Sequence, residues 1–191
     1  MQRTTLALVS MMALSLAACG KKAEDTTAAD NSAAASVATA NMGDTMTAPA
    51  SGGQAFANQA AASDAFEIAT SKLALDNSSS AAVKKYANQM IAAHTASTDK
   101  LKATTAALTP AITPDPTLST EQQATVDSLK ALKGAAFDTA YIAAQQSGHQ
   151  QTLDALKAYG ATGDVPALKT FATGLTPTVA AHLNMAKSLT A

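Results

Sequence analysis

The chain has 191 residues, a formal net charge of −1 and only 4% aromatic residues. This length suits one domain with a sizeable core plus tails, and the near-neutral charge gives no excess that would attract nucleic acid. Trp is absent and Ala is abundant, which favours close-packed helices over an aromatic-rich β-sandwich or barrel. We therefore predict an all-α protein that does not bind nucleic acid.

The N-terminal segment has the pattern of a lipoprotein signal peptide. Arg3 supplies a positive charge, residues 6–14 are apolar, and the sequence LAAC at 16–19 resembles the lipobox that lipoprotein signal peptidase cuts just before its Cys. The apolar run is too short for a transmembrane helix. Cys19 is the only cysteine of the chain, so it has no partner for an internal disulfide. We predict that Cys19 is acylated; an ordinary secretory signal cleaved near Ala18 is the alternative.

Acylation of Cys19 would anchor the protein to a membrane, because each buried CH₂ contributes about 0.8 kcal/mol and several chains bind far more firmly than one. Gly20 follows the cysteine, which resembles the sorting signal of Gram-negative lipoproteins that reach the outer membrane. That resemblance implies a cell-envelope protein on the outer membrane, facing the periplasm.

Residues 20–53 are mostly Ala, Thr and Ser with a few charges and no aromatic residue. Such a segment buries too little apolar area to offset an ordering entropy of about 1–2 kcal/mol per residue. We therefore predict three parts: a signal peptide at 1–18, the acylated cysteine with a disordered linker at 19–53, and a helical domain at 54–191.

Two amphipathic segments form the first half of the predicted domain. Residues 54–76 carry apolar residues on one side of a helix, and the polar run at 77–80 ends it. Ser80 is a suitable N-cap for a second helix that runs from Ala81 to about Thr109. The proline-rich sequence TPAITPDP at 109–116 stops that helix, because proline removes backbone donors and restricts the residue before it.

Two further helices are predicted after this proline-rich connection. The sequence STEQ at 119–122 forms a capping box for a third helix that runs to about Tyr159, with a bend at Gly134. Gly160 and Gly163 end the third helix, and the fourth begins at Asp164 or Val165 and bends near Leu175. These elements match a four-helix bundle. The connection between the second and third helices makes either an antiparallel return or a longer crossover.

Several spaced sequences in the domain resemble one bacterial family. They are QMIAAHTAS at 89–97, GAAFD at 134–138 with Tyr141, GHQQTL at 148–153, and 175–182 with Met185-Ala186; Glu67 also matches a glutamate common in the first helix. Over roughly residues 54–191 the chain resembles the envelope family known as domain of unknown function 4142. The resemblance implies a ferritin-like bundle and an envelope location, and carries no established activity. The family tends to place Asp before the first two histidines, where this chain has Ala93 and Gly148.

All three histidines of the chain fall on predicted helix seams. The candidate polar core or ligand site comprises Glu67, His94, Asp138, Tyr141, His149 and His182. One interpretation is a metal site, because ferritin-like bundles bind iron or manganese with imidazole and carboxylate. The other interpretation is that the imidazoles are core residues satisfied by hydrogen bonds.

Helix geometry limits the metal interpretation. Asp138 and His149 are 11 residues apart, which separates them by about 16 Å along a helix. A turn near Gly160 places His182 level with Ile142, so we expect His182 to pair with Asp138 or Tyr141. Glu67 is expected to face solvent. The Glu-x-x-His motif of di-iron bundles is also missing, since Ile91, Gln146 and Val179 precede the histidines by three. We therefore predict no bound cofactor, with iron or manganese at Asp138 and His182 as the alternative.

No catalytic pattern identifies an enzyme. The sequence has no Ser-His-Asp elbow, no Gly-rich phosphate loop and no basic stripe with interleaved aromatic residues. We therefore predict a non-catalytic envelope lipoprotein, connected with stress, that binds a protein partner or a small ligand. The alternative is a ferritin-like metal-binding or redox protein.

Overall fold

The computed structural model describes residues 52–191, and this part of the chain is all-helical, with no strand. The five helices are α1 (Gly52–Asn77), α2 (Ala81–Ala106), α3 (Thr120–Lys130), α4 (Gly134–Thr162) and α5 (Pro166–Ser188). The all-α prediction is therefore confirmed. The predicted signal peptide, Cys19 and nearly all of the predicted linker lie outside the described residues. None of the described helices has the length and apolarity needed to span a membrane.

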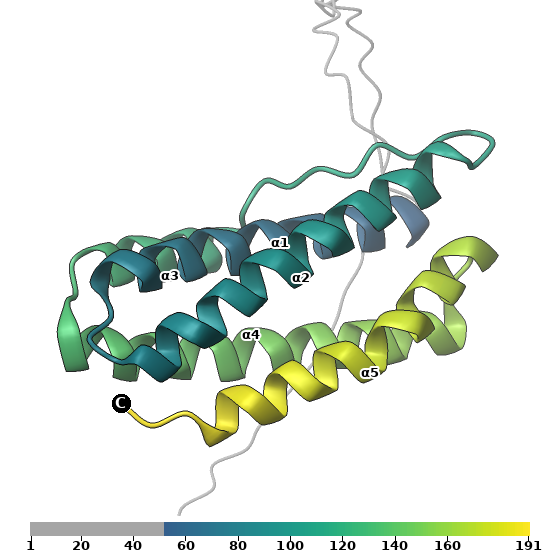
Figure 1. Ribbon diagram of the computed structural model, residues 1–191. Helices are drawn as coiled ribbons and strands as arrows, with labels where there is room; N and C mark the ends of the chain where they lie inside the picture. The colour runs from purple at the N-terminus through teal and green to yellow at the C-terminus, as the bar shows by residue number, and fades with distance from the viewer. Residues whose placement is uncertain (1–51) are drawn as a thin grey trace, which may run out of the picture. The chain divides into compact units, whose positions relative to one another are not determined.

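The four long helices form two hairpins that lie side by side (Figure 1). Residues 78–80 join α1 to α2, and residues 163–165 join α4 to α5. α1 packs against α2 and α4, and α5 packs against α4 and α2. The predicted cap of α2 is confirmed, since Ser80 Oγ accepts a hydrogen bond from the Val83 backbone N–H at 3.4 Å.

The proline-rich connection makes the longer crossover that the sequence left as one of two alternatives. α2 and α4 run in the same direction (Figure 1), so the chain must return between them along α1. Two hydrogen bonds fasten the returning segment to α1: Gln54 donates to the Thr113 carbonyl at 2.7 Å, and Asn58 accepts from the Asp115 N–H at 3.0 Å. α3 continues this return and packs against α1 and α4.

The predicted third helix is two helices, so the prediction of one bent helix is wrong. The capping box at its start is confirmed: the side chain of Ser119 accepts from the Gln122 N–H, and the side chain of Gln122 accepts from the Ser119 N–H. The helix ends at Lys130, however, and α4 starts at Gly134, whose φ is +60°. This left-handed conformation suits glycine and interrupts the helix instead of bending it.

The turn between α4 and α5 also lies later than predicted. α4 continues through Gly160 to Thr162, and Gly163 is its C-cap. α5 begins at Pro166, which takes the first-turn position that tolerates proline, as predicted, and it continues through Pro177. This shift of the turn changes which residues of α4 and α5 face each other.

The core consists of two apolar clusters with a polar layer between them. The first cluster includes Phe56, Leu101, Leu153, Leu156, Leu168, Phe171 and Leu183. The second includes Val83, Tyr86, Met90, Leu129, Phe137, Tyr141 and Ile142. The polar layer lies between these groups along α1, α2 and α4, and on α5 it lies at the end of the first cluster, next to Leu183. All of its residues are buried: Asp64, Glu67, Thr70, Ser71, His94, Gln145, His149 and His182. Four helices thus place polar side chains at one level of an otherwise apolar interior.

Candidate functional site

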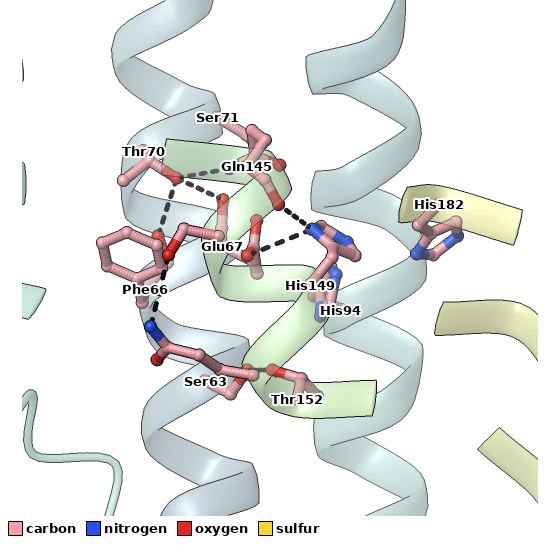
Figure 2. Close-up of polar contacts among 12 residues, drawn as sticks. Ser63, Phe66, Glu67, Thr70, Ser71, His94, Gln145, His149, Thr152 and His182 are labelled. Atoms are coloured by element: carbon pink, nitrogen blue, oxygen red, sulfur yellow. Dashed lines mark hydrogen bonds and ion pairs between the residues drawn. The ribbon is translucent and has the colours of Figure 1, made fainter. Parts of the chain in front are cut away.

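The polar layer brings all three histidines of the chain together from three helices. His94 lies on α2, His149 on α4 and His182 on α5, with exposed fractions of 5%, 1% and 8%. Their ring centroids form a nearly equilateral triangle, with separations of 5.6, 5.7 and 5.5 Å. One nitrogen of each ring lies within 4.8 Å of the others. Figure 2 shows His94 and His149 beside Glu67, and His182 reaching toward them from α5.

Hydrogen bonds at Nδ1 fix the orientations of two of the three imidazoles. His94 Nδ1 lies 2.8 Å from Asp64 Oδ1, and Asp64 Oδ2 also accepts from Thr98 Oγ1 at 3.2 Å. His149 Nδ1 lies 2.9 Å from the Gln145 carbonyl oxygen. Because a carbonyl oxygen only accepts, His149 carries its hydrogen on Nδ1 when it is neutral, and its lone pair is therefore on Nε2.

Each ring has one nitrogen without a hydrogen-bond partner among the described residues. These nitrogens are His94 Nε2, His149 Nε2 and His182 Nδ1, and all three are buried. A buried polar atom without a partner costs about 1–3 kcal/mol, so the cluster carries this cost three times. Hydrogen bonding within the core explains the Nδ1 atoms of two rings, but it leaves these three unpartnered nitrogens unexplained.

The electrostatics keep two of the rings neutral. Burial lowers the pKa of His149 to about 3 and that of His182 to about 4, and the charge of nearby His94 adds to both shifts. Burial alone would also lower the pKa of His94, but the hydrogen bond that His94 donates to Asp64 and the negative charges of Glu67 and Asp64 outweigh it and raise that pKa. Neutral imidazole is the form that binds metal ions.

Glu67 is part of this layer, so the expectation that it faces solvent is wrong. The residue is 1% exposed, and its Oε1 lies 3.4 Å from His149 Nδ1. Burial raises the pKa of Glu67 to about 7, although the charge of His94 and the amide of Gln145 oppose the shift. α1 packs against α2, α3 and α4, which gives it more than the one buried face that the sequence pattern had indicated.

Asp138 and Tyr141 belong to other parts of the core. Asp138 Oδ2 accepts from the Ser79 hydroxyl at 2.9 Å and from the Ser79 N–H at 3.3 Å, in the turn between α1 and α2. The Tyr141 hydroxyl lies 2.8 Å from Ser71 Oγ. The expected pairing of His182 with either residue is therefore wrong.

The later turn between α4 and α5 explains this error. When the turn that joins the antiparallel helices α4 and α5 is centred on Asp164 instead of residue 162, His182 lies level with Gln146, within about one helical turn of His149. His182 therefore meets the other two histidines instead of Asp138.

Sequence reasoning missed Asp64, which orients His94. A signal for it was present, because Asp64 follows Ala57 and Ala61 by seven and three residues and so continues a buried stripe of α1. An acidic residue on the buried face of one helix is a candidate hydrogen-bond partner for a histidine on the buried face of a neighbouring helix.

The described chain is thus an all-helical domain with three converging, buried imidazoles. The model of the family described as Domain of unknown function (DUF4142) matches residues 37–189, so the chain belongs to this family, as the sequence resemblance predicted. The comparison with curated proteins found no match, and the comparison with solved structures found none either.

Proposed function

We propose that this protein binds one divalent transition-metal ion through His94, His149 and His182. The observation that carries the proposal is that each of the three buried rings has one nitrogen within 4.8 Å of a nitrogen of each other ring, and that each ring also has a buried nitrogen without a hydrogen-bond partner among the described residues. A single cation at the centre of the triangle would engage all three at once. Asp64 and Gln145 would hold two of the rings from behind, as the outer partners of metal-binding histidines usually do.

The distances fit a small metal ion. Metal–nitrogen bonds of about 2.0–2.1 Å in a tetrahedral site place the ligand nitrogens about 3.3 Å apart. Since one nitrogen of each ring already lies within 4.8 Å of those of the other two, these nitrogens need to approach by at most about 1.5 Å. Small side-chain rotations are enough for that. Imidazole donors suit zinc, copper, nickel and iron.

The donor set supports a mononuclear site and not the di-iron or di-manganese centre of ferritin-like proteins. Such centres take a Glu from each of two helices and a Glu-x-x-His motif from each of the other two. Here the two carboxylates next to the histidines, Asp64 and Glu67, both come from α1. The crossover between the second and third long helices does support a four-helix bundle of the ferritin-like type.

Metal analysis of the purified full-length chain in detergent tests this proposal. After removal of metal with EDTA and addition of zinc or cobalt, we expect one bound ion per chain and a higher melting temperature, because a ligand that binds only the folded state stabilises it. His149→Ala and His182→Ala should abolish both effects. Gln146→Ala is the matched control, since its side chain bonds the Ala186 carbonyl and not the cluster. Stoichiometric binding that survives both histidine substitutions would refute the site.

We also propose that the protein carries out this function as a lipoprotein of the bacterial envelope. The support is the LAAC sequence at 16–19 together with the lack of another cysteine that Cys19 could pair with. Labelling with a fatty-acid analogue should mark the wild-type chain but not Cys19→Ala, which should also remain unprocessed. An unlabelled wild-type chain that stays out of the membrane fraction would contradict the lipid anchor.

A further inference from the structure

Resting on the metal site proposed above, we infer that the bound metal keeps one coordination position for a small ligand from solution. The place for this ligand is a cavity of about 40 Å³ beside the cluster, lined by two of the three histidines, His94 and His182, and also by Asp64. The site would then be of the open kind, in which a small molecule binds directly to the metal, and not a closed structural site.

The protein itself leaves the fourth position unfilled. Three imidazoles supply three of the four ligands of a tetrahedral metal. The two nearby carboxylates approach the rings from behind: Asp64 Oδ1 binds Nδ1 of His94, and Glu67 Oε1 faces Nδ1 of His149. The unpartnered nitrogens are on the other side of both rings. Of the two carboxylates only Glu67 has an unpartnered oxygen, Oε2, so a swing of Glu67 onto the metal is the competing arrangement.

The size and lining of the cavity define the class of ligand. A cavity of roughly 10–15 Å³ holds one water molecule. The cavity of about 40 Å³ therefore accommodates a ligand of about two or three heavy atoms. The wall is mostly apolar, with Ala60, Leu156, Leu175 and Val179 among its residues, and the hydroxyls of two further lining residues, Ser63 and Thr152, bond to each other at 2.8 Å. The ligand is therefore held mainly by the metal and by its size. Water, hydroxide and small linear anions fit this volume, and larger organic molecules do not.

The cavity is also close to the surface between α2 and α5. Ala93 and Ser97 of α2, which line it, are partly exposed, and Thr178 of α5 is exposed. His182 is the most exposed of the three histidines, at 8%. A small ligand therefore has a short path from solvent to the metal.

Azide binding to the cobalt-loaded, full-length protein tests the inference. The visible spectrum of bound cobalt reports its coordination, so we expect a saturable change on addition of azide, with one azide bound per cobalt. Ala93→Leu should fill the cavity and weaken azide binding by about tenfold or more, because added methylene groups have no space there. Ala92→Leu is the matched control, since Ala92 is exposed on the same helix and does not line the cavity. Ser97→Leu provides a second cavity variant if Ala93→Leu does not fold.

The outcomes separate this inference from the proposed function. If cobalt does not bind, the metal site itself is wrong. If cobalt binds but its spectrum does not respond to azide, the metal site stands and the open position is refuted; recovery of the response in Glu67→Gln would then show that Glu67 fills it. If the folded cavity variants bind cobalt and azide as tightly as wild type, the cavity is not the place where the ligand binds.

Discussion

The substitution Asp64→Asn removes the negative charge of the side chain and keeps nearly the same shape, so it tests the role of the charge alone. The carboxylate is 4% exposed, and it accepts from His94 Nδ1 at 2.8 Å and from Thr98 Oγ1 at 3.2 Å. Asparagine keeps a carbonyl oxygen for one of these bonds but removes the charge. Hydrogen bonds to charged groups contribute about 1.5–3 kcal/mol and neutral ones about 0.5–1.5 kcal/mol. We therefore expect a loss of about 1–2 kcal/mol in the free energy of unfolding of the metal-free protein.

The loss should depend on pH in a specific direction. The pKa of His94 is raised above its ordinary value of 6.5, because the hydrogen bond that it donates to Asp64 and the nearby carboxylate charges outweigh the effect of burial. A raised pKa contributes stability that is fully present below the unfolded-state value and is lost as the pH rises through the folded-state value. Asp64→Asn removes much of this contribution, so its destabilising effect should be larger at pH 6 than at pH 9.

Urea unfolding followed by circular dichroism measures this effect, at both pH values and with EDTA present, in protein that begins at Gly20. Asp99→Asn is the control, because Asp99 is exposed on α2 and such surface changes usually shift stability by less than about 0.5 kcal/mol. In separate titrations, Asp64→Asn should weaken metal binding by about 10–100-fold, the usual effect of losing an outer partner of a ligand. An equal loss of stability at both pH values, or a larger loss at pH 9, would refute the role of the Asp64 charge in stabilising protonated His94.

Two further predictions concern the packing around the polar layer. Replacing a helical glycine by alanine usually raises the free energy of unfolding by roughly 0.5–1 kcal/mol. Gly148→Ala should not bring this gain, because its Cβ would lie 3.0 Å from Glu67 Oε1. Gly174→Ala should bring it, because the nearest atom to its Cβ is Lys100 Nζ at 3.7 Å. Chemical denaturation measures both, and equal gains would contradict the close approach of Glu67. Tyr141→Phe should destabilise the domain by about 1–3 kcal/mol, because it leaves the buried Ser71 hydroxyl unpaired. Most of that loss should disappear when Ser71 is already alanine; additive losses in this double-mutant cycle would show that the hydrogen bond contributes nothing.

The helix ends that depend on local chemistry could be predicted from the sequence. Ser80 and the capping box at 119–122 act on backbone groups two or three residues away, so their effect needs no tertiary information. Gly134 is different, because the sequence shows that a glycine is present but not the sign of its φ. Its value of +60° separates α3 from α4, where the sequence pattern predicted a bend.

The candidate site required the register between helices, which the sequence does not contain. Seam spacing correctly indicated that His94, His149 and His182 are buried. Their meeting depends on where the turn between α4 and α5 falls, and continuing α4 through Gly160 moved the level of His182 toward His149. Glu67 was misplaced because a helix that packs against three others has no single buried face.

The polar layer raises the question of why the core tolerates it, since apolar residues of similar volume often serve stability as well as or better than a buried ion pair. Conformational specificity is one answer, because Asp64 with His94, and the Gln145 carbonyl with His149, bond across or along helices at one level only. That answer covers only Nδ1 of His94 and Nδ1 of His149. The three unpartnered ring nitrogens do not help to fix the register between helices, because they bond to no described residue. Places where a core breaks the rule of satisfied polar groups are often functional sites. One nitrogen of His94 and one of His149 thus serve the fold, and a ligand at the centre of the triangle would account for the unpartnered nitrogen of each of the three rings.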